Sequence, residues 1–179
     1  MIELVGKHGT STTNAESIKK NGFTPFPGRR GKGIYFWKDG PFAEALAHES
    51  YSFNFKKRSF SGQRNPNCTI ITAKLYTEED GLFDLTKDYN FEAFVSYIKT
   101  INLTAPTERE ERKKFYAQKI DEFIVEIEAR AGLKVKVICV SVPAPVKQSV
   151  YPVDILGHPH AYVVKNNIRI ELCGFKLMR

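Results

Sequence analysis

The chain has 179 residues, 42% hydrophobic and 26% charged, which are ordinary values for a single globular domain. No apolar run approaches the roughly 20 residues of a membrane-spanning helix, and the N-terminus lacks the pattern of a signal peptide, so we expect a cytoplasmic protein with no membrane partner. The net charge of +7 favours a polyanionic partner. The three cysteines, Cys68, Cys139 and Cys173, lack metal-ligand spacing, so we expect reduced thiols and no metal.

The first part of the chain predicts a strand followed by a short helix. Residues 2–8 have the composition of a strand. Thr13 and Glu16 then form a capping box, the pattern that opens a helix. Asn21 and Gly22 are residue types that favour the end of one.

A second strand and a second helix are expected next. Residues 33–37 predict the strand, and Asp39 is a plausible N-cap with Pro41 near the first turn. The alanine-rich residues 43–47 continue as the helix. Residues 68–76 alternate and carry the β-branched types of a third strand.

The middle of the chain is expected to be helical. Its first half places apolar side chains at helical spacing. Thr107 with Glu110 is a second capping box that opens a longer helix, and Gly132 ends it. We therefore predict one domain over residues 1–179 with a helical insertion at about residues 88–132.

The last part returns to strands, at residues 134–142, 161–165 and 168–177. Strands at both ends of a chain, with helices between them, fit an α+β domain with a mostly antiparallel, split sheet.

Two motifs near the N-terminus and one near the C-terminus carry a family resemblance. His8, Gly9 and Thr10 are followed by GRRGKGIYFW, which holds Tyr35 and Phe36, and the late motif reads HAYVVKNNIRIEL. Together they resemble the ADP-ribosyltransferases, in particular the poly- and mono-ADP-ribosyltransferase branch, whose three marks are a histidine, a tyrosine and a glutamate. The resemblance covers the two ends of the chain and implies that family's split sheet, with NAD as co-substrate.

The resemblance implies a role for each residue of the first two motifs. His8 would hydrogen-bond a ribose hydroxyl of NAD, the Gly9 backbone would pair with the nicotinamide amide, and Thr10 would shape the strand end. A glycine suits this place because a flat ligand can approach a backbone that has no side chain. Tyr35 would place its ring against the nicotinamide, in a pocket that also includes Phe36. A histidine at a strand end and a tyrosine on a strand are also common structural residues.

Two further cofactor-binding positions depart from the family pattern. Family members often carry a serine and a second tyrosine where this chain has Ala43 and Leu46. One face of the nicotinamide would then rest on an aliphatic side chain, and a serine hydrogen bond to its amide would be missing.

The third catalytic position shows the largest departure from the family pattern. The family's glutamate stands directly before Tyr-Val-Val and stabilises positive charge on the ribose, and here that position is Ala161. Losing such a group costs on the order of 100 to 1,000-fold in rate, so the chain as written is expected to be nearly inactive. Three explanations stay open: deliberate removal of the acid from a toxic transferase, a naturally inactive binder, or replacement by Glu171 or Asp154.

A basic segment with interleaved phenylalanines, residues 50–65, suggests the acceptor. Its cations Lys56, Lys57, Arg58 and Arg64 suit the phosphates of RNA or DNA, while the rings suit unpaired bases. The alternative is a solvated loop.

We therefore expect an NAD-dependent ADP-ribosyltransferase, a toxin or phage-defence effector that modifies RNA or DNA and is neutralised by an antitoxin protein, here inactivated at Ala161. The alternatives are a catalytically silent NAD or ADP-ribose-binding module, a transferase that acts on protein, and an RNA-processing enzyme that moves a phosphate onto NAD. His48, His158 and His160 predict no metal site, because further ligands are missing.

Overall fold

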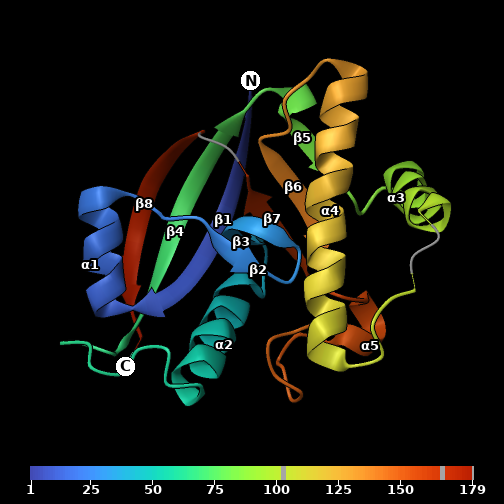
Figure 1. The fold of residues 1–179 in the computed structure, drawn as a ribbon. Coiled ribbons are helices and arrows are strands. Elements are labelled where there is room, and N and C mark those ends of the chain that lie inside the picture. Colours follow the sequence, from blue (N-terminus) through green and yellow to red (C-terminus); the bar gives the residue numbers. More distant parts are fainter. Residues whose placement is uncertain (102–103, 166–167, 179) are drawn as a thin grey trace.

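The structure, a computed structural model, describes residues 1–101, 104–165 and 168–178. Within these residues the chain forms a mostly antiparallel eight-stranded sheet and five α-helices (Figure 1). The α+β class and the mostly antiparallel sheet predicted from the sequence are therefore confirmed. No helix in the described part of the chain is long and apolar enough to cross a membrane.

The strands, in chain order, are β1 (Ile2–Ser11), β2 (Phe26–Gly28), β3 (Gly31–Lys38), β4 (Cys68–Thr77), β5 (Leu82–Asp84), β6 (Val137–Ser141), β7 (His160–Val164) and β8 (Arg169–Leu177). The helices are α1 (Thr12–Asn21), α2 (Ala43–Lys56), α3 (Asp88–Thr100), α4 (Arg109–Ala131) and α5 (Val153–Leu156).

The sheet has the strand order β5-β6-β7-β3-β1-β4-β8, and β2 pairs with β3 beside this path. Only β5 and β6 run parallel among the described strand pairs. Helices α3 and α4, predicted as an insertion, form the connection between these two parallel strands, as a parallel pair requires.

The sheet is almost divided between β1 and β3. These strands pair only at Gly6 with Lys38 and at Lys7 with Trp37, whereas β1 and β4 pair along the whole length of β1. Past Lys7 the two strands diverge. Two half-sheets, β5-β6-β7-β3 and β1-β4-β8, therefore meet at a narrow junction, which we call the β1–β3 junction.

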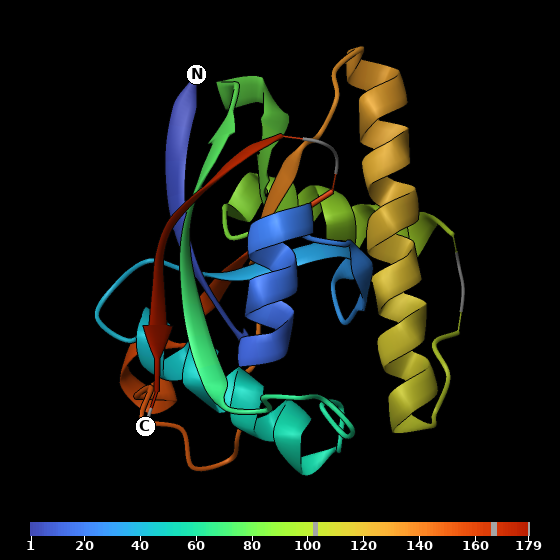
Figure 2. The same ribbon diagram turned by 90° about the vertical axis from the view of Figure 1, so that its left-hand side faces the viewer.

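The helices form a layer on each face of the sheet (Figures 1 and 2). Helix α1 contacts β1, β4 and β8, while α2 and α4 pack on the other face and α3 lies outside α4. On the α4 side, Ile120, Phe123 and Ile124 are buried against the β6 and β7 residues Ile138 and Val163. Helix α4 therefore supplies part of the hydrophobic core.

Several predicted helix starts were wrong, because other groups engage the expected caps. The Ser11 hydroxyl, not Thr13, caps α1 by accepting from the Asn14 N–H at 3.1 Å, while the Thr13 hydroxyl bonds to the backbone of Asn65. Glu108, not Thr107, caps α4 by accepting from two backbone N–H groups.

The second helix also differs from the prediction. Its N-cap position is Phe42, which makes no side-chain cap bond, so the expected Asp39 cap was wrong. The helix extends to Lys56 and therefore takes up the first part of the basic segment. The helix ends at Gly22 and Gly132 are confirmed, and Gly132 has the positive φ of 65° that favours glycine.

Candidate functional site

A cavity of about 310 Å³ opens at the β1–β3 junction, on the sheet face that α2 covers. Its walls come from β1, the β2–β3 hairpin, α2, β7 and the loop after β6. We call it the aromatic cavity, because five of its lining residues are aromatic: Phe26, Tyr35, Phe36, Trp37 and Phe53. The Phe36 ring itself is buried on the opposite face of the sheet, with Ile34 and Leu75. Rings at such a density suit a flat aromatic ligand.

The aromatic cavity brings together five of the residues predicted to form the site. His8 and Gly9 reach it from β1, Tyr35 and Phe36 from β3, and Ala161 from β7. These segments lie far apart in the sequence and meet because β3 pairs with both β1 and β7.

Ala43 and Leu46 do not line the aromatic cavity. Both are buried at the start of α2 and line a different cavity of about 220 Å³. The α2 residues that line the aromatic cavity are Ser50, Phe53 and Asn54, which lie about two helical turns further on. Ser50 and Phe53 repeat the serine and aromatic spacing of the family, a signal present in the sequence but displaced along the chain.

Thr10 also lies outside the aromatic cavity. It is buried, and its hydroxyl oxygen accepts a hydrogen bond from the Asn14 side-chain amide at 3.3 Å. This contact links β1 to α1, which agrees with a role in shaping the strand end.

The Tyr35 hydroxyl closes the β2–β3 hairpin. It donates to the Gly31 carbonyl at 2.6 Å and accepts from the Arg30 N–H at 3.0 Å, and burial raises the pKa of Tyr35 to about 12. The hydroxyl therefore stays protonated and is fully engaged within the protein. The ring is the part that faces the cavity, 5.4 Å from the ring of Phe26. A Cβ on Gly28 would lie 2.4 Å from this ring, so only glycine fits there.

Gly9 is required for packing. A Cβ at this position would lie 1.9 Å from the Ala47 carbonyl oxygen, because the α2 backbone crosses β1 here. The structure therefore gives this glycine a packing role, because the helix backbone occupies the space where a side chain would point. The approach of a ligand to the Gly9 backbone stays a prediction.

His8 has a defined tautomer. Its Nδ1 lies 2.9 Å from the Tyr35 carbonyl oxygen, which can only accept, so Nδ1 carries the proton and Nε2 is a bare acceptor. The ring packs between Phe23 and Phe36, at 5.4 and 5.9 Å between centroids, and burial lowers its pKa. At neutral pH His8 is therefore uncharged.

Two polar side chains of α2 line the cavity and can each make a further hydrogen bond. The Trp37 indole N–H donates to the Ser50 hydroxyl oxygen at 2.9 Å, which leaves the Ser50 hydrogen to donate elsewhere. The Asn54 side-chain amide has no hydrogen-bond partner among the residues that the structure describes. A hydroxyl and an amide placed in this way suit the carboxamide of a ligand.

The charge of the aromatic cavity is positive. Lys7 and Arg29 line it, and no aspartate or glutamate does so within the described ranges, although the Lys7 ammonium lies 3.9 Å from a carboxylate oxygen of Asp39. Ala161 is 3% exposed and pairs with Trp37, so its side chain points to the same face as the Tyr35 ring. The cavity therefore holds no carboxylate to stabilise a developing positive charge.

Neither proposed substitute acid reaches Ala161. Glu171 lies on the edge strand β8, separated from β7 by three strands, or on the order of 15–20 Å. Its carboxylate accepts from Tyr76 at 3.3 Å and pairs with Arg169 at 3.0 Å. Asp154 lies on α5 and does not line the cavity.

The cations of the predicted basic segment are distributed over the end of α2 and the turns that follow it. Lys56 ends α2, and Arg58 and Arg64 are exposed in the following turns. Of the four cations, Lys57 lines a cavity of about 480 Å³, and its ammonium lies 4.4 Å from the centroid of the Phe53 ring.

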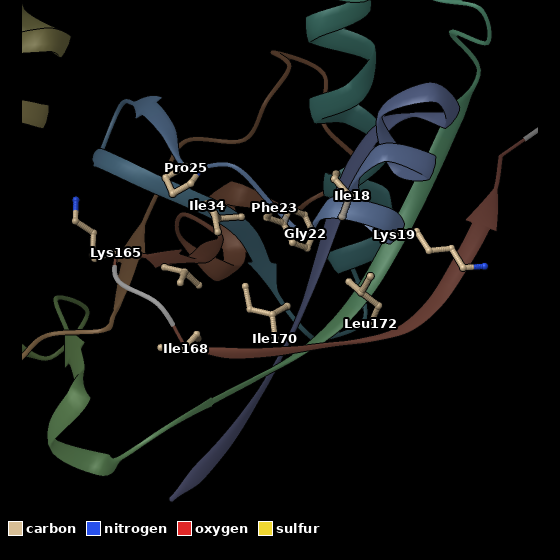
Figure 3. A pocket seen from close by; sticks show the side chains of 11 residues that line it. Ile18, Lys19, Gly22, Phe23, Pro25, Ile34, Lys165, Ile168, Ile170 and Leu172 are labelled. Atoms are coloured by element: carbon tan, nitrogen blue, oxygen red, sulfur yellow. The ribbon is translucent and has the colours of Figure 1, made fainter.

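A further cavity of about 350 Å³ lies on the α1 face of the sheet (Figure 3). Figure 3 shows apolar side chains, among them Phe23, Ile34 and Ile170, gathered between β3 and β8. Its two lysines, Lys19 and Lys165, extend outward at opposite ends. Among the residues that the structure describes, its lining includes no acidic side chain.

No group of three or more metal-ligating side chains is present within residues 1–101, 104–165 and 168–178. Comparisons with family models, with curated proteins and with solved structures give no match to this chain.

Proposed function

We propose that the chain is a domain of the ADP-ribosyltransferase type, which binds NAD with the nicotinamide ring in the aromatic cavity and which Ala161 leaves without efficient turnover. The observation that carries this proposal is the meeting of His8, Tyr35 and Ala161 at one ring-lined cavity, placed where the sheet opens between β1 and β3.

The lining of the cavity supports nicotinamide as the ligand. The ring would lie against Tyr35 and Phe53, with the carboxamide next to Ser50 and Asn54. A ribose hydroxyl would donate to Nε2 of His8, the bare acceptor of that ring. Aromatic stacking contributes about 0.5–1.5 kcal/mol beyond the burial of the rings.

The proposed reaction explains why an alanine at position 161, in place of a glutamate, would slow turnover. The bond between the ribose carbon and the nicotinamide nitrogen breaks, and its electron pair leaves with nicotinamide as a neutral molecule. The acceptor forms a new bond to that carbon and releases a proton. Positive charge builds on the ribose in between, and a carboxylate beside it lowers the barrier. Lys7 and Arg29 carry the opposite charge, so the cavity as it stands opposes this step.

The absence of a carboxylate from the described lining of the cavity also favours the second candidate, a binding module that never turns NAD over. The two candidates agree on binding and differ only at position 161. Both are compatible with a toxin or defence setting, in which an active form would harm the cell.

Binding can be tested with the chain's own fluorescence. Trp37 is the single tryptophan and lines the aromatic cavity, so a ligand that enters should quench its emission. We expect saturable quenching by NAD and by nicotinamide, and weaker binding when Phe53 is replaced by alanine. A Phe91→Ala variant is the matched control, because Phe91 is exposed on α3 and does not line the aromatic cavity. Equal NAD affinity in the Phe53 variant and the unmodified chain would contradict the proposal.

A further inference from the structure

A second opening, the basic groove, adjoins the aromatic cavity. It has a volume of about 480 Å³ and lies between the β2–β3 hairpin, the end of α2 and the first half of α4. Five cations line it: Arg29, Lys32, Lys57, Lys113 and Lys114.

Most of this positive charge is unpaired. The two acids of the groove, Glu110 and Asp121, already pair with Lys113 and with Lys165. The remaining four cations of the groove make no ion pair with any residue that the structure describes. A groove with this excess of positive charge attracts a chain of phosphates.

The basic groove and the aromatic cavity share one boundary. Gly28, Arg29 and Phe53 line both of them. The Phe53 ring lies 4.4 Å from the Lys57 ammonium and 5.9 Å from the Arg29 guanidinium, measured to the ring centroid. An aromatic face flanked by two cations suits a nucleotide, because the base stacks on the ring while the phosphate meets the charges.

We propose that the basic groove binds the sugar–phosphate backbone of a single-stranded nucleic acid and leads an unpaired nucleotide to the aromatic cavity. This inference rests on the proposed function, because it names the acceptor of the ADP-ribosyl group. Four unpaired cations exceed what the two phosphates of NAD require. The strand is single because a base stacked within a duplex cannot reach an enclosed site.

The groove differs from the basic segment predicted from the sequence. Lys57 is common to both, but Lys56, Arg58 and Arg64 do not line the groove. In their place it takes Arg29 and Lys32 from the hairpin and lysines from α4. Because these residues come from three elements, their proximity could not be read from their spacing.

The test uses a fluorescein-labelled 12-nucleotide oligouridylate or oligothymidylate and measures its anisotropy with the full chain. We expect binding of the oligonucleotide that weakens as salt is added. The triple variant Lys32→Ala, Lys57→Ala, Lys114→Ala should bind about 100-fold more weakly at 0.1 M salt. This follows because each lost phosphate contact removes about 0.7 from the slope of log affinity against log salt. The slope itself should flatten by about 2. Circular dichroism confirms that the variant is folded.

The matched control removes the same charge from the predicted segment. The variant Lys56→Ala, Arg58→Ala, Arg64→Ala should keep most of the affinity, since these side chains lie outside the groove. Equal losses in the two triple variants would overturn the proposal, because diffuse charge would then account for binding. Equal affinity for a duplex of the same length would also overturn it, and so would no binding at all, which would favour a protein acceptor.

NAD titration by Trp37 fluorescence separates this inference from the proposed function. We expect the groove variant to keep its NAD affinity while it loses the oligonucleotide. A parallel loss of both, with NAD displacing the oligonucleotide, would show that the groove holds the NAD diphosphate and would overturn the inference. Failure of NAD to quench any variant, with oligonucleotide binding intact, would overturn the proposed function and leave the groove as a nucleic-acid site.

Discussion

Restoring a carboxylate at position 161 is the decisive perturbation. The Ala161→Glu variant would place its side chain on the sheet face that carries Tyr35 and Trp37, directed into a cavity of about 310 Å³ that has room for the added methylene and carboxylate. We expect the rate of NAD cleavage to rise by on the order of 100-fold or more, equivalent to about 2.7 kcal/mol of transition-state stabilisation.

The variant Ala161→Gln is the matched control, because it has nearly the same shape and no charge. Nicotinamide release, measured by chromatography, should rise in the glutamate variant alone. Cleavage should also increase with pH as the introduced carboxyl group ionises, and burial among rings raises the pKa at which this occurs. In cells, expression of the glutamate variant should be harmful, while the unmodified chain and the glutamine variant are tolerated.

Folding must be measured alongside activity. A buried carboxyl group without a full set of partners costs about 1–3 kcal/mol, and the thermal midpoint of the glutamine variant reports the part of this cost that comes from shape. Adding His8→Ala to the glutamate variant should abolish the gain, because the ribose hydroxyl would lose its acceptor. A folded glutamate variant that binds NAD but releases no nicotinamide, with RNA, DNA and protein acceptors present, would refute the enzymatic reading in favour of the silent module.

Three further outcomes are expected. Tyr35→Phe should lower the free energy of unfolding by about 1–3 kcal/mol, because the Arg30 N–H and the Gly31 carbonyl lose their partner, and it should leave the NAD affinity nearly unchanged. Tyr35→Ala should also weaken NAD binding, by about 1 kcal/mol or more in the fluorescence titration. Gly9→Ala should destabilise the fold by about 3 kcal/mol or more in urea denaturation, because its Cβ would overlap the α2 backbone; a stability equal to that of the unmodified chain would contradict the packing. Burial lowers the pKa of His8 in the folded state below its ordinary 6.5, so the unfolded state binds more protons and the free energy of unfolding should fall as the pH drops through 6.5. In His8→Gln this part of the pH dependence should vanish. An unchanged pH profile of that variant would assign the dependence to another group.

The strands of the sheet were the most predictable part of the fold. Alternation and β-branched residues correctly predicted β4, and the ends of α1 and α4 followed from Gly22 and Gly132. The short strands β2 and β5 were missed because three residues carry no periodic signal. The helix caps failed because Thr13 bonds to a loop more than fifty residues away, a contact that local patterns do not contain.

The candidate site could be predicted where a short local motif identifies the residues. It could not be predicted where residues were chosen by their distance along the sequence from such a motif. The motifs around His8 and Tyr35 lie next to each other in space because their strands are neighbours in the sheet. On α2, a fixed offset from Tyr35 selected Ala43 and Leu46, but the turn before the helix shifts the side chains that face the cavity by two helical turns. The role of the Tyr35 hydroxyl depends on the conformation of a hairpin, which the sequence motif does not report.

The narrow β1–β3 junction divides the sheet into two half-sheets whose strands pair directly at only two residue pairs. The half-sheets are also held together by the His8 bond to the Tyr35 carbonyl, by the α2 backbone above Gly9, and by a buried cluster in which Ile34 and Phe36 pack with Ala73 and Leu75. A ligand in the aromatic cavity touches both half-sheets, because its walls come from β1 on one side and from β3 and β7 on the other. We therefore expect a ligand bound there to restrain the two half-sheets relative to each other, so that the order gained on binding extends beyond the residues that the ligand contacts.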